Sequence, residues 1–258
     1  MILRIPTDID LPPHPHPLPC LPQAGAGGEG FLFFSPPLTG GDGGEGEKRG
    51  MVMRRNSFVY SVTRWIARVV FCLFYRIETE KEGVLFDQGP VIILPKHQYW
   101  TDIPMISLVI RPLLHFVAKR ELFKYPLIRN YLSLLGGIPV DRQQTIRTLN
   151  SFKSLLSLLR AGEKIVIFPE GTYFRDGVGS GKSRLLQMIL SFQGELKYDI
   201  PFVPVGIRYG ERVGWRRRVE IRMGHPLFAE KESDAISLTH RVMEEIGRLC
   251  GLPQISTA

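Results

Sequence analysis

Short apolar runs alternate with helical patterns along most of the chain, and this alternation restricts the possible folds more than any other feature. The run Val91-Ile92-Ile93-Leu94 is short and rich in β-branched residues, which is typical of a buried strand. Strands separated by helices predict a single α/β domain with a mostly parallel central sheet flanked by helices. We expect strands at residues 90–94, 114–118, 164–168, 202–207 and 219–223, and helices at residues 102–110, 127–134, 145–159, 182–192 and 233–250.

A histidine and an aspartate follow the first of these strands, at the kind of sheet edge where ligands bind in α/β proteins. His97 and Asp102 are five residues apart, a rotation of about 140° on a helix, so they can meet only if His97 lies on the turn before the helix. Asp102 would then fix the ring tautomer and leave the other nitrogen as a general base for a substrate hydroxyl. The spacing alone also fits a helix-capping aspartate and an unrelated loop histidine.

Three further blocks follow in this order: Gly136-Gly137-Ile138-Pro139-Val140-Asp141-Arg142, Ile167-Phe168-Pro169-Glu170-Gly171-Thr172 and Phe202-Val203-Pro204-Val205-Gly206-Ile207. Together with the H-x4-D pair they resemble the glycerolipid acyltransferase family, whose best-known members are the 1-acylglycerol-3-phosphate O-acyltransferases. The resemblance covers residues 91–207 and implies an acyltransferase domain at residues 81–258. It also implies transfer of an acyl group from acyl-CoA or acyl carrier protein to the hydroxyl of a lysophospholipid such as 1-acylglycerol-3-phosphate, with no metal or redox cofactor.

The resemblance places an acceptor-binding site in these blocks. Arg142 would bind the acceptor's phosphate, although a surface salt bridge with Asp141 fits the sequence equally well. Glu170 would orient the acceptor, and Gly171 would permit a close backbone approach. Backbone N–H groups after Asp102 or near Gly171 would stabilise the oxyanion. The remaining residues expected at this site are Thr172, Arg175 and Lys182.

Two positions depart from the family pattern. Tyr173 stands where an arginine commonly follows the threonine, and the next arginine is Arg175. This departure weakens the case for lysophosphatidate as the acceptor. Lys96 stands where asparagine is frequent before the histidine, a difference that we treat as minor.

Residues 1–50 are rich in proline and glycine and cannot bury enough apolar surface to fold, so we expect a disordered tail. The tail has no uninterrupted apolar run of the kind found in a signal peptide. Because Met51-Val52-Met53-Arg54-Arg55 resembles an ordinary protein start, our hypothesis is that the native chain begins at Met51 or Met53 and the tail is a mis-called extension. A tail peptide found by mass spectrometry of the native protein would contradict this.

Residues 57–75 are strongly apolar but contain Arg64 and Arg68. A spanning helix would carry both near the bilayer centre, at a cost of about 2.5–3.5 kcal/mol each. The two arginines are four residues apart and share a helix face. We therefore expect, within residues 51–80, an amphipathic helix that lies in the membrane interface on the cytoplasmic side. The alternatives are a spanning helix and a helix that packs on the domain's own core with its arginines outward.

The chain is basic, with a formal net charge of +8. The tail holds three of the 33 basic and six of the 25 acidic residues, so the remainder has 30 and 19 and a net charge of +11. An anionic membrane surface or substrate is the expected partner. Residues 176–183 resemble a phosphate-binding loop but lack its first glycine, so we do not expect an ATPase. Trp215 beside Arg216-Arg217-Arg218 suits anionic lipid as well as RNA, and we expect no nucleic acid partner. Three scattered cysteines show no disulfide or zinc spacing.

Two rival functions fit the same residues. One is a non-catalytic lipid-binding protein of this fold, which would bind liposomes without consuming a thioester. The other is an acyl-thioester hydrolase with water as the nucleophile, which would release thiol without an added lysolipid. An assay of thiol release with and without lysolipid separates all three functions.

Overall fold

The computed structural model describes residues 56–83, 89–110, 113–140, 146–196 and 199–255, with the backbone alone for residues 146–152. The expected tail at residues 1–50, with the proposed start at Met51 or Met53, lies outside these ranges. Arg142, the expected phosphate ligand, also lies outside them.

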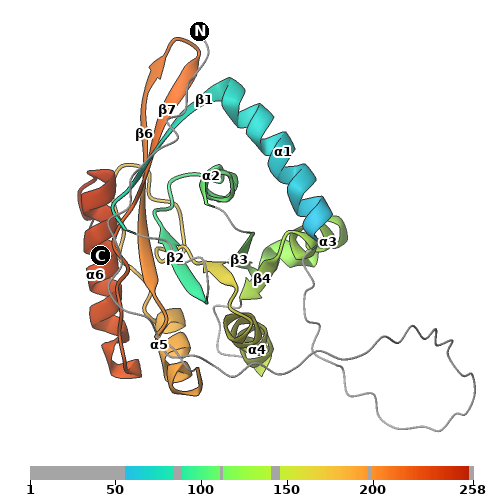
Figure 1. Ribbon diagram of the computed structural model, residues 1–258, viewed down its shortest axis with the longest axis vertical. Coiled ribbons are helices and arrows are strands. Elements are labelled where there is room, and N and C mark those ends of the chain that lie inside the picture. The colour runs from blue at the N-terminus through green and yellow to red at the C-terminus, as the bar shows by residue number, and fades with distance from the viewer. Residues whose placement is uncertain (1–55, 84–88, 111–112, 141–145, 197–198, 256–258) are drawn as a thin grey trace, which may run out of the picture. The chain divides into compact units, whose positions relative to one another are not determined.

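The described strands form one seven-stranded sheet with the order β1-β7-β6-β2-β5-β3-β4 (Figure 1). All neighbouring strands are parallel except β6 and β7, which pair antiparallel, so the predicted, mostly parallel sheet is confirmed. Strands β1 and β4 are not among the five strand ranges expected from the sequence. The strands are β1 (Tyr75–Lys81), β2 (Val91–Pro95), β3 (Leu114–Lys119), β4 (Gly137–Val140), β5 (Lys164–Val166), β6 (Phe202–Val213) and β7 (Arg216–Met223).

Strand β2 lies between β5 and β6, and all of its residues are buried. Its side chains alternate between the two faces of the sheet, as strand geometry requires. Ile92 and Leu94 belong to one hydrophobic cluster, and Val91 and Ile93 belong to the other. Burial on both faces explains why this run is apolar throughout.

Helices cover both faces of the sheet (Figure 1). Side chains of α4, α5 and α6 pack in the first cluster, and those of α1 and α2 pack in the second. The five helices that the sequence predicts at residues 102–250 are all present, with ends that differ by a few residues. The helices are α1 (Ser57–Phe74), α2 (Asp102–Val109), α3 (Pro126–Leu134), α4 (Ile146–Arg160), α5 (Arg184–Ser191) and α6 (Ala235–Cys250).

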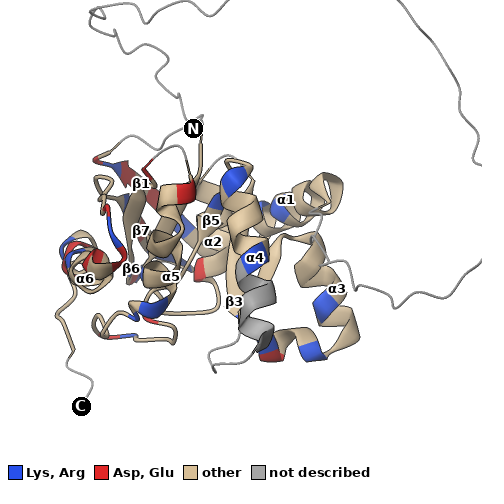
Figure 2. Ribbon diagram, turned by 90° about the horizontal axis from the view of Figure 1, so that it is seen from below, with Lys and Arg blue, Asp and Glu red and all other residues tan. Residues whose placement is uncertain are grey.

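Charge is distributed unevenly over these elements (Figure 2). Helices α1, α3 and α4 contain lysine or arginine and no acidic residue, whereas α6 and β1 carry both signs. A surface with such a basic part suits an anionic partner.

Helix α1 packs one side against the domain. Tyr60 and Phe71 are buried, and Arg64 donates from Nη2 to the Leu108 carbonyl of α2 at 3.3 Å. The alternative of a helix packed on the domain with its arginines outward agrees with this packing and with the exposed Arg68, but not with Arg64, which is half-buried. Large apolar side chains face outward instead: Phe58, Val62, Trp65, Ile66, Val69, Val70, Leu73 and Phe74.

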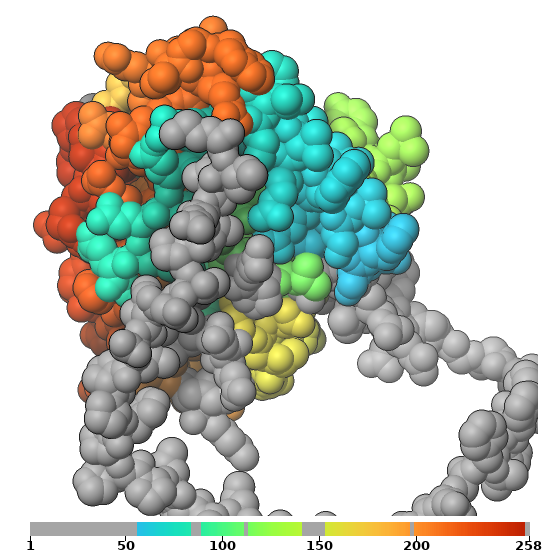
Figure 3. Space-filling view, turned by 45° about the horizontal axis from the view of Figure 1, so that its top comes forward, coloured from blue at the N-terminus to red at the C-terminus, as the bar shows by residue number. Residues whose placement is uncertain are grey.

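The outer surface of α1 is broad and apolar. Figure 3 shows α1, in blue to cyan, on the surface between the β6–β7 hairpin in orange and α3 in light green. Its 18 residues have a mean hydropathy of 1.4, and 11% of them are buried, so by length and composition α1 is a helix that can cross a membrane. It nevertheless runs directly into β1, since Phe74 ends the helix and Tyr75 begins the strand.

Helix α6 packs closely against β6 at Gly206. A Cβ atom on Gly206 would lie 2.6 Å from Leu249 Cβ and 2.7 Å from the Cys250 backbone nitrogen. Contacts of this length do not occur in packed proteins, so only glycine allows the helix to lie this close to the strand.

We expect Gly206→Ala to destabilise the fold by about 1–3 kcal/mol, because α6 would have to move away from β6. Urea denaturation measures this loss. The matched control is Gly210→Ala on the same strand, where an added Cβ would lie an ordinary 3.6 Å from Arg218 Cβ. Equal stability of the two variants would contradict the close packing.

Candidate active site

The turn between β2 and α2 brings His97 and Asp102 together. His97 lies on this turn, before the helix, and its Nδ1 is 3.1 Å from Asp102 Oδ2. The same oxygen accepts hydrogen bonds from the backbone N–H groups of Gln98 at 2.6 Å and Tyr99 at 2.8 Å. The other oxygen, Oδ1, accepts from the Tyr209 hydroxyl at 2.6 Å. The fully buried carboxylate is therefore held by four partners that also fix its orientation.

The imidazole of His97 is held between two aromatic rings. Its centroid lies 4.0 Å from that of Phe168, nearly stacked, and 4.3 Å from that of Tyr173. A carboxylate at Nδ1 favours the tautomer with its proton there, which leaves Nε2 without a proton and able to accept one. The ring is mostly buried but lines a cavity. This is the arrangement of an oriented general base.

A buried ion pair lies behind the turn. Lys96 Nζ is 2.8 Å and 3.0 Å from the two carboxylate oxygens of Glu170, and neither side chain is accessible to solvent. Lys96 also donates to the carbonyls of Phe174 at 2.7 Å and His97 at 3.1 Å. Glu170 accepts the backbone N–H groups of His97 at 2.8 Å and Gly179 at 2.9 Å. The pair thus joins the His97 turn to the loop that follows β5.

These contacts correct the role expected for Glu170. Both of its oxygens are occupied by protein donors, and it is not among the residues that line the cavity. A buried carboxylate needs such partners because an unpaired buried charge is costly. Lys96, which the sequence analysis treated as a minor difference, supplies the positive charge. Gly179 donates its N–H to Glu170, so part of the stretch at residues 176–183 packs on the protein's own carboxylate.

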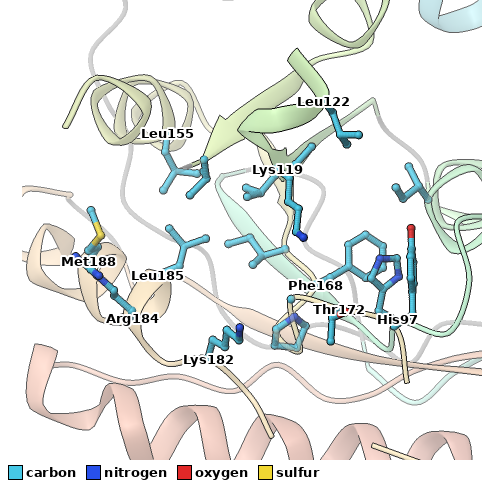
Figure 4. A pocket seen from close by; sticks show the side chains of 18 residues that line it. His97, Lys119, Leu122, Leu155, Phe168, Thr172, Lys182, Arg184, Leu185 and Met188 are labelled. Carbon is cyan, nitrogen blue, oxygen red and sulfur yellow. The ribbon is translucent and has the colours of Figure 1, made fainter. Parts of the chain in front are cut away.

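The cavity beside His97 has a volume of about 450 Å³ (Figure 4). His97 lies at one end of it, and Arg184 and Met188 lie at the other. Its walls are largely apolar, and its charged lining residues are all cationic: Lys119 at the end of β3, Lys182 before α5, and Arg184. Such a cavity suits a molecule with an anionic group and an apolar chain.

The structure divides the expected acceptor residues into two groups. Gly171, Thr172 and Lys182 line the cavity. Arg175 does not: its guanidinium lies over the Tyr99 ring, 5.3 Å from the centroid. The Gly171 N–H donates to the Phe168 carbonyl at 3.1 Å, so this amide is engaged within its own turn, and the oxyanion donors after Asp102 or near Gly171 stay a prediction.

Comparison with known proteins identifies the family. Residues 74–208, more than half of the chain, match the family model described as Acyltransferase. The chain belongs to this family. The match begins at the last residue of α1 and ends in β6, so it contains His97, Asp102 and the loop with Glu170.

Two curated relatives of this acyltransferase family member carry names that state an acceptor. The lyso-ornithine lipid O-acyltransferase of Rhizobium meliloti (strain 1021) is 29% identical over 147 residues, which are 56% of this chain and 48% of the relative. The 1-acyl-sn-glycerol-3-phosphate acyltransferase of Bacillus subtilis (strain 168) is 37% identical over 93 residues, 36% of this chain and 45% of the relative. The matches thus span about half the length of these relatives.

A solved structure shares the fold. The crystal structure of the 1-acyl-sn-glycerophosphate acyltransferase from Thermotoga maritima is similar with a TM-score of 0.55 at 24% identity. The similarity covers 74% of this chain and 80% of that one. It confirms the α/β architecture.

Three residues of the candidate site were missed or undervalued in the sequence. Lys119 ends a strand whose predicted range stopped one residue earlier, and Tyr209 lies on the part of β6 beyond the predicted end at residue 207. Both would have been candidates if the strands had been extended toward the ligand-binding edge. Lys96 follows a buried strand, and a lysine there should have prompted a search for an acidic partner.

We expect Lys96→Met to destabilise the protein by about 3–5 kcal/mol, because Glu170 would keep a buried charge without its partner. Urea denaturation measures this. The matched control is Arg160→Met, which breaks an exposed pair with Glu195 and should change stability by less than about 1 kcal/mol. A similar loss of unfolding free energy in both variants would show that the buried pair contributes no more to stability than the exposed one.

Proposed function

We propose that the chain is a membrane-associated O-acyltransferase that moves an acyl group from an acyl thioester to the hydroxyl of a lysophospholipid such as 1-acylglycerol-3-phosphate. The observation that carries this proposal is the His97–Asp102 pair at the end of a largely apolar, cationic cavity. The named acceptors of the relatives, lyso-ornithine lipid and 1-acylglycerol-3-phosphate, support a lysolipid. Acyl-CoA or acyl carrier protein is the donor, and no metal takes part.

In this mechanism His97 acts as the general base. Its Nε2 takes the proton from the acceptor hydroxyl as the oxygen attacks the thioester carbonyl. The tetrahedral intermediate then expels the thiolate, which receives the proton from the imidazolium. Asp102 keeps the ring in the required tautomer and stabilises the positive charge that the imidazolium carries between these two proton transfers.

The cationic side chains bind the anionic groups of the substrates. Lys119 and Lys182 line the cavity from two different segments (Figure 4), and the site that we propose for a phosphate is between them. Arg184 and Met188 line the far end, where an apolar chain and a second anionic group fit. Both the acceptor and the thioester donor carry phosphate, so this positive lining suits either.

The outward apolar face of α1 supports membrane association. Exposed aromatic and aliphatic side chains with basic residues and no acidic ones are typical of a helix at an anionic membrane interface. Arg64 is bonded to α2, and α1 continues into the sheet, so an in-plane position suits it better than a spanning one. Helix α3 lies beside α1 and exposes Leu127 and Tyr131. The Tyr131 hydroxyl donates a hydrogen bond to Thr63 Oγ1 of α1. The cytoplasmic face is the side we propose.

The central test is His97→Ala, which should lower acyl transfer by about 10²–10⁴-fold, because general-base catalysis has that size. Thiol release from acyl-CoA, with lipid products identified for a panel of lysolipids, measures it. The matched control is His240→Ala, an exposed histidine on α6, which should be as active as the wild type.

Other outcomes of this assay would replace the proposal. A His97→Ala variant with most of its activity would end the mechanism. Thiol release that does not need a lysolipid would indicate a hydrolase, and liposome binding without any thiol release would indicate a lipid-binding protein.

Membrane docking is tested by the double variant Trp65→Ser and Val69→Ser on the outer face of α1. Burial of each side chain in the interface is worth about 1.5 kcal/mol or more, so vesicle binding should fall by at least about tenfold. Co-sedimentation with vesicles that contain anionic phospholipid measures it. The control is Ile236→Ser, an exposed apolar residue on α6. Equal binding by all three proteins would show that α1 is not the docking surface.

A further inference from the structure

We propose that Tyr209 is a positioning residue for the His97–Asp102 pair and acts through Asp102 Oδ1. This inference rests on the proposed function and adds to it. Tyr209 lies on β6, far from the turn in sequence, and outside all four blocks that carry the family resemblance. Its hydroxyl nevertheless lies 2.6 Å from Asp102 Oδ1.

The two oxygens of Asp102 have separate tasks. Oδ2 faces His97 Nδ1 and the backbone N–H groups of the turn. With these contacts alone, the carboxylate would be held at Oδ2 only and could rotate about that atom. The Tyr209 hydroxyl is the donor at Oδ1 and fixes the plane of the carboxylate from the opposite side. Because the imidazole is oriented by Oδ2, a tilt of the carboxylate would turn the base away from the acceptor, and small displacements of this kind are costly in rate.

The direction of the hydrogen bonds follows from the chemistry. An ionised carboxylate only accepts, so Tyr209 gives its proton to Asp102. The Tyr209 oxygen is then free to accept from Thr101 Oγ1, which lies 2.7 Å away. A chain of bonds thus runs from Thr101 through Tyr209 and Asp102 to His97, and each bond polarises the next. Burial, followed by the charge of Asp102, raises the pKa of the Tyr209 phenol, which therefore stays protonated.

Packing holds the Tyr209 ring in this position. The Arg217 guanidinium lies 5.2 Å from its centroid, and the Tyr99 ring meets it edge-on at 4.7 Å. Tyr75 of β1 lies 6.3 Å away, also edge-on. The Met105 sulfur is 3.5 Å from the hydroxyl. The ring is therefore fixed by three separate elements, and loss of the hydroxyl alone should leave it in place.

Removal of the hydroxyl has a predictable effect on pH dependence. With one donor fewer, Asp102 presents more of its negative charge to His97, which then holds a proton more tightly. His97 must be neutral to act as a base, so the acid limb of the kcat/KM profile should move to higher pH. The substitution does not alter the other charged or titratable groups around this pair. They are Lys96 with Glu170 behind the turn, Lys119 and Lys182 across the cavity, Tyr173 against the imidazole, Arg217 over the Tyr209 ring and Arg175 over the Tyr99 ring.

The test compares Tyr209→Phe with Tyr75→Phe. Tyr209→Phe should lower kcat by about tenfold or more, the usual size for a lost hydrogen bond to a charged group, and should shift the acid limb upward. KM should change little, because Tyr209 does not line the cavity. Tyr75→Phe removes a hydroxyl from the same aromatic cluster but none of the four partners of Asp102, and should keep both the wild-type kcat and the wild-type profile.

A Tyr209→Phe variant with wild-type kcat and pH profile would overturn the proposal, as would an equal loss in Tyr75→Phe. If Tyr209→Phe does not fold, Thr101→Val replaces it: a smaller change of the same sign supports the proposal and no change overturns it. If the wild type transfers no acyl group, the proposed function fails separately. An NMR titration of His97 then tests the role of Tyr209, with the His97 signal assigned by its loss in His97→Gln. If Tyr209→Phe leaves the midpoint of this titration unchanged, the role of Tyr209 is overturned.

Discussion

The buried ion pair between Lys96 and Glu170 is the interaction on which the site depends. It joins the end of β2 to the loop after β5 and supplies a hydrogen-bond acceptor to the His97 backbone. Because a buried charge without its partner is costly, both segments must be in place together. The general base therefore sits on a backbone that is fixed from behind, while its ring remains open to the cavity.

Two layers of positioning surround the imidazole. The ion pair fixes the backbone of His97, and Asp102, held in turn by Tyr209 and two amides, fixes its ring. Phe168 and Tyr173 limit the remaining rotation. The reacting groups of the proposed mechanism come from the substrates, so the protein's contribution lies in orientation and electrostatics, for which rigid supports are suited.

The sequence predicted the parts of this structure that local patterns encode. Apolar periodicity located β2 and the helices from residue 102 onward. The H-x4-D spacing showed that His97 could meet Asp102 only from the turn before the helix, and the structure shows that contact. The sequence did not predict the partner of Glu170, because Lys96 lies 74 residues away and only the folded chain brings them together. Tyr209 was missed because the predicted strand ended at residue 207, two residues before it. The sequence also predicted an amphipathic helix with a membrane-facing apolar surface, but not that Arg64 would bond α2, because composition does not tell which side of a helix meets the domain.

The junction between α1 and β1 has a further consequence. No linker separates the last helical residue, Phe74, from the first strand residue, Tyr75, and the helix is also bonded to α2 through Arg64. A helix docked in a bilayer through its outer face would therefore hold the sheet at one height and one tilt above the lipid headgroups. The distance that a lipid must rise from the leaflet to reach His97 is then set by the fold, not by a swinging tether.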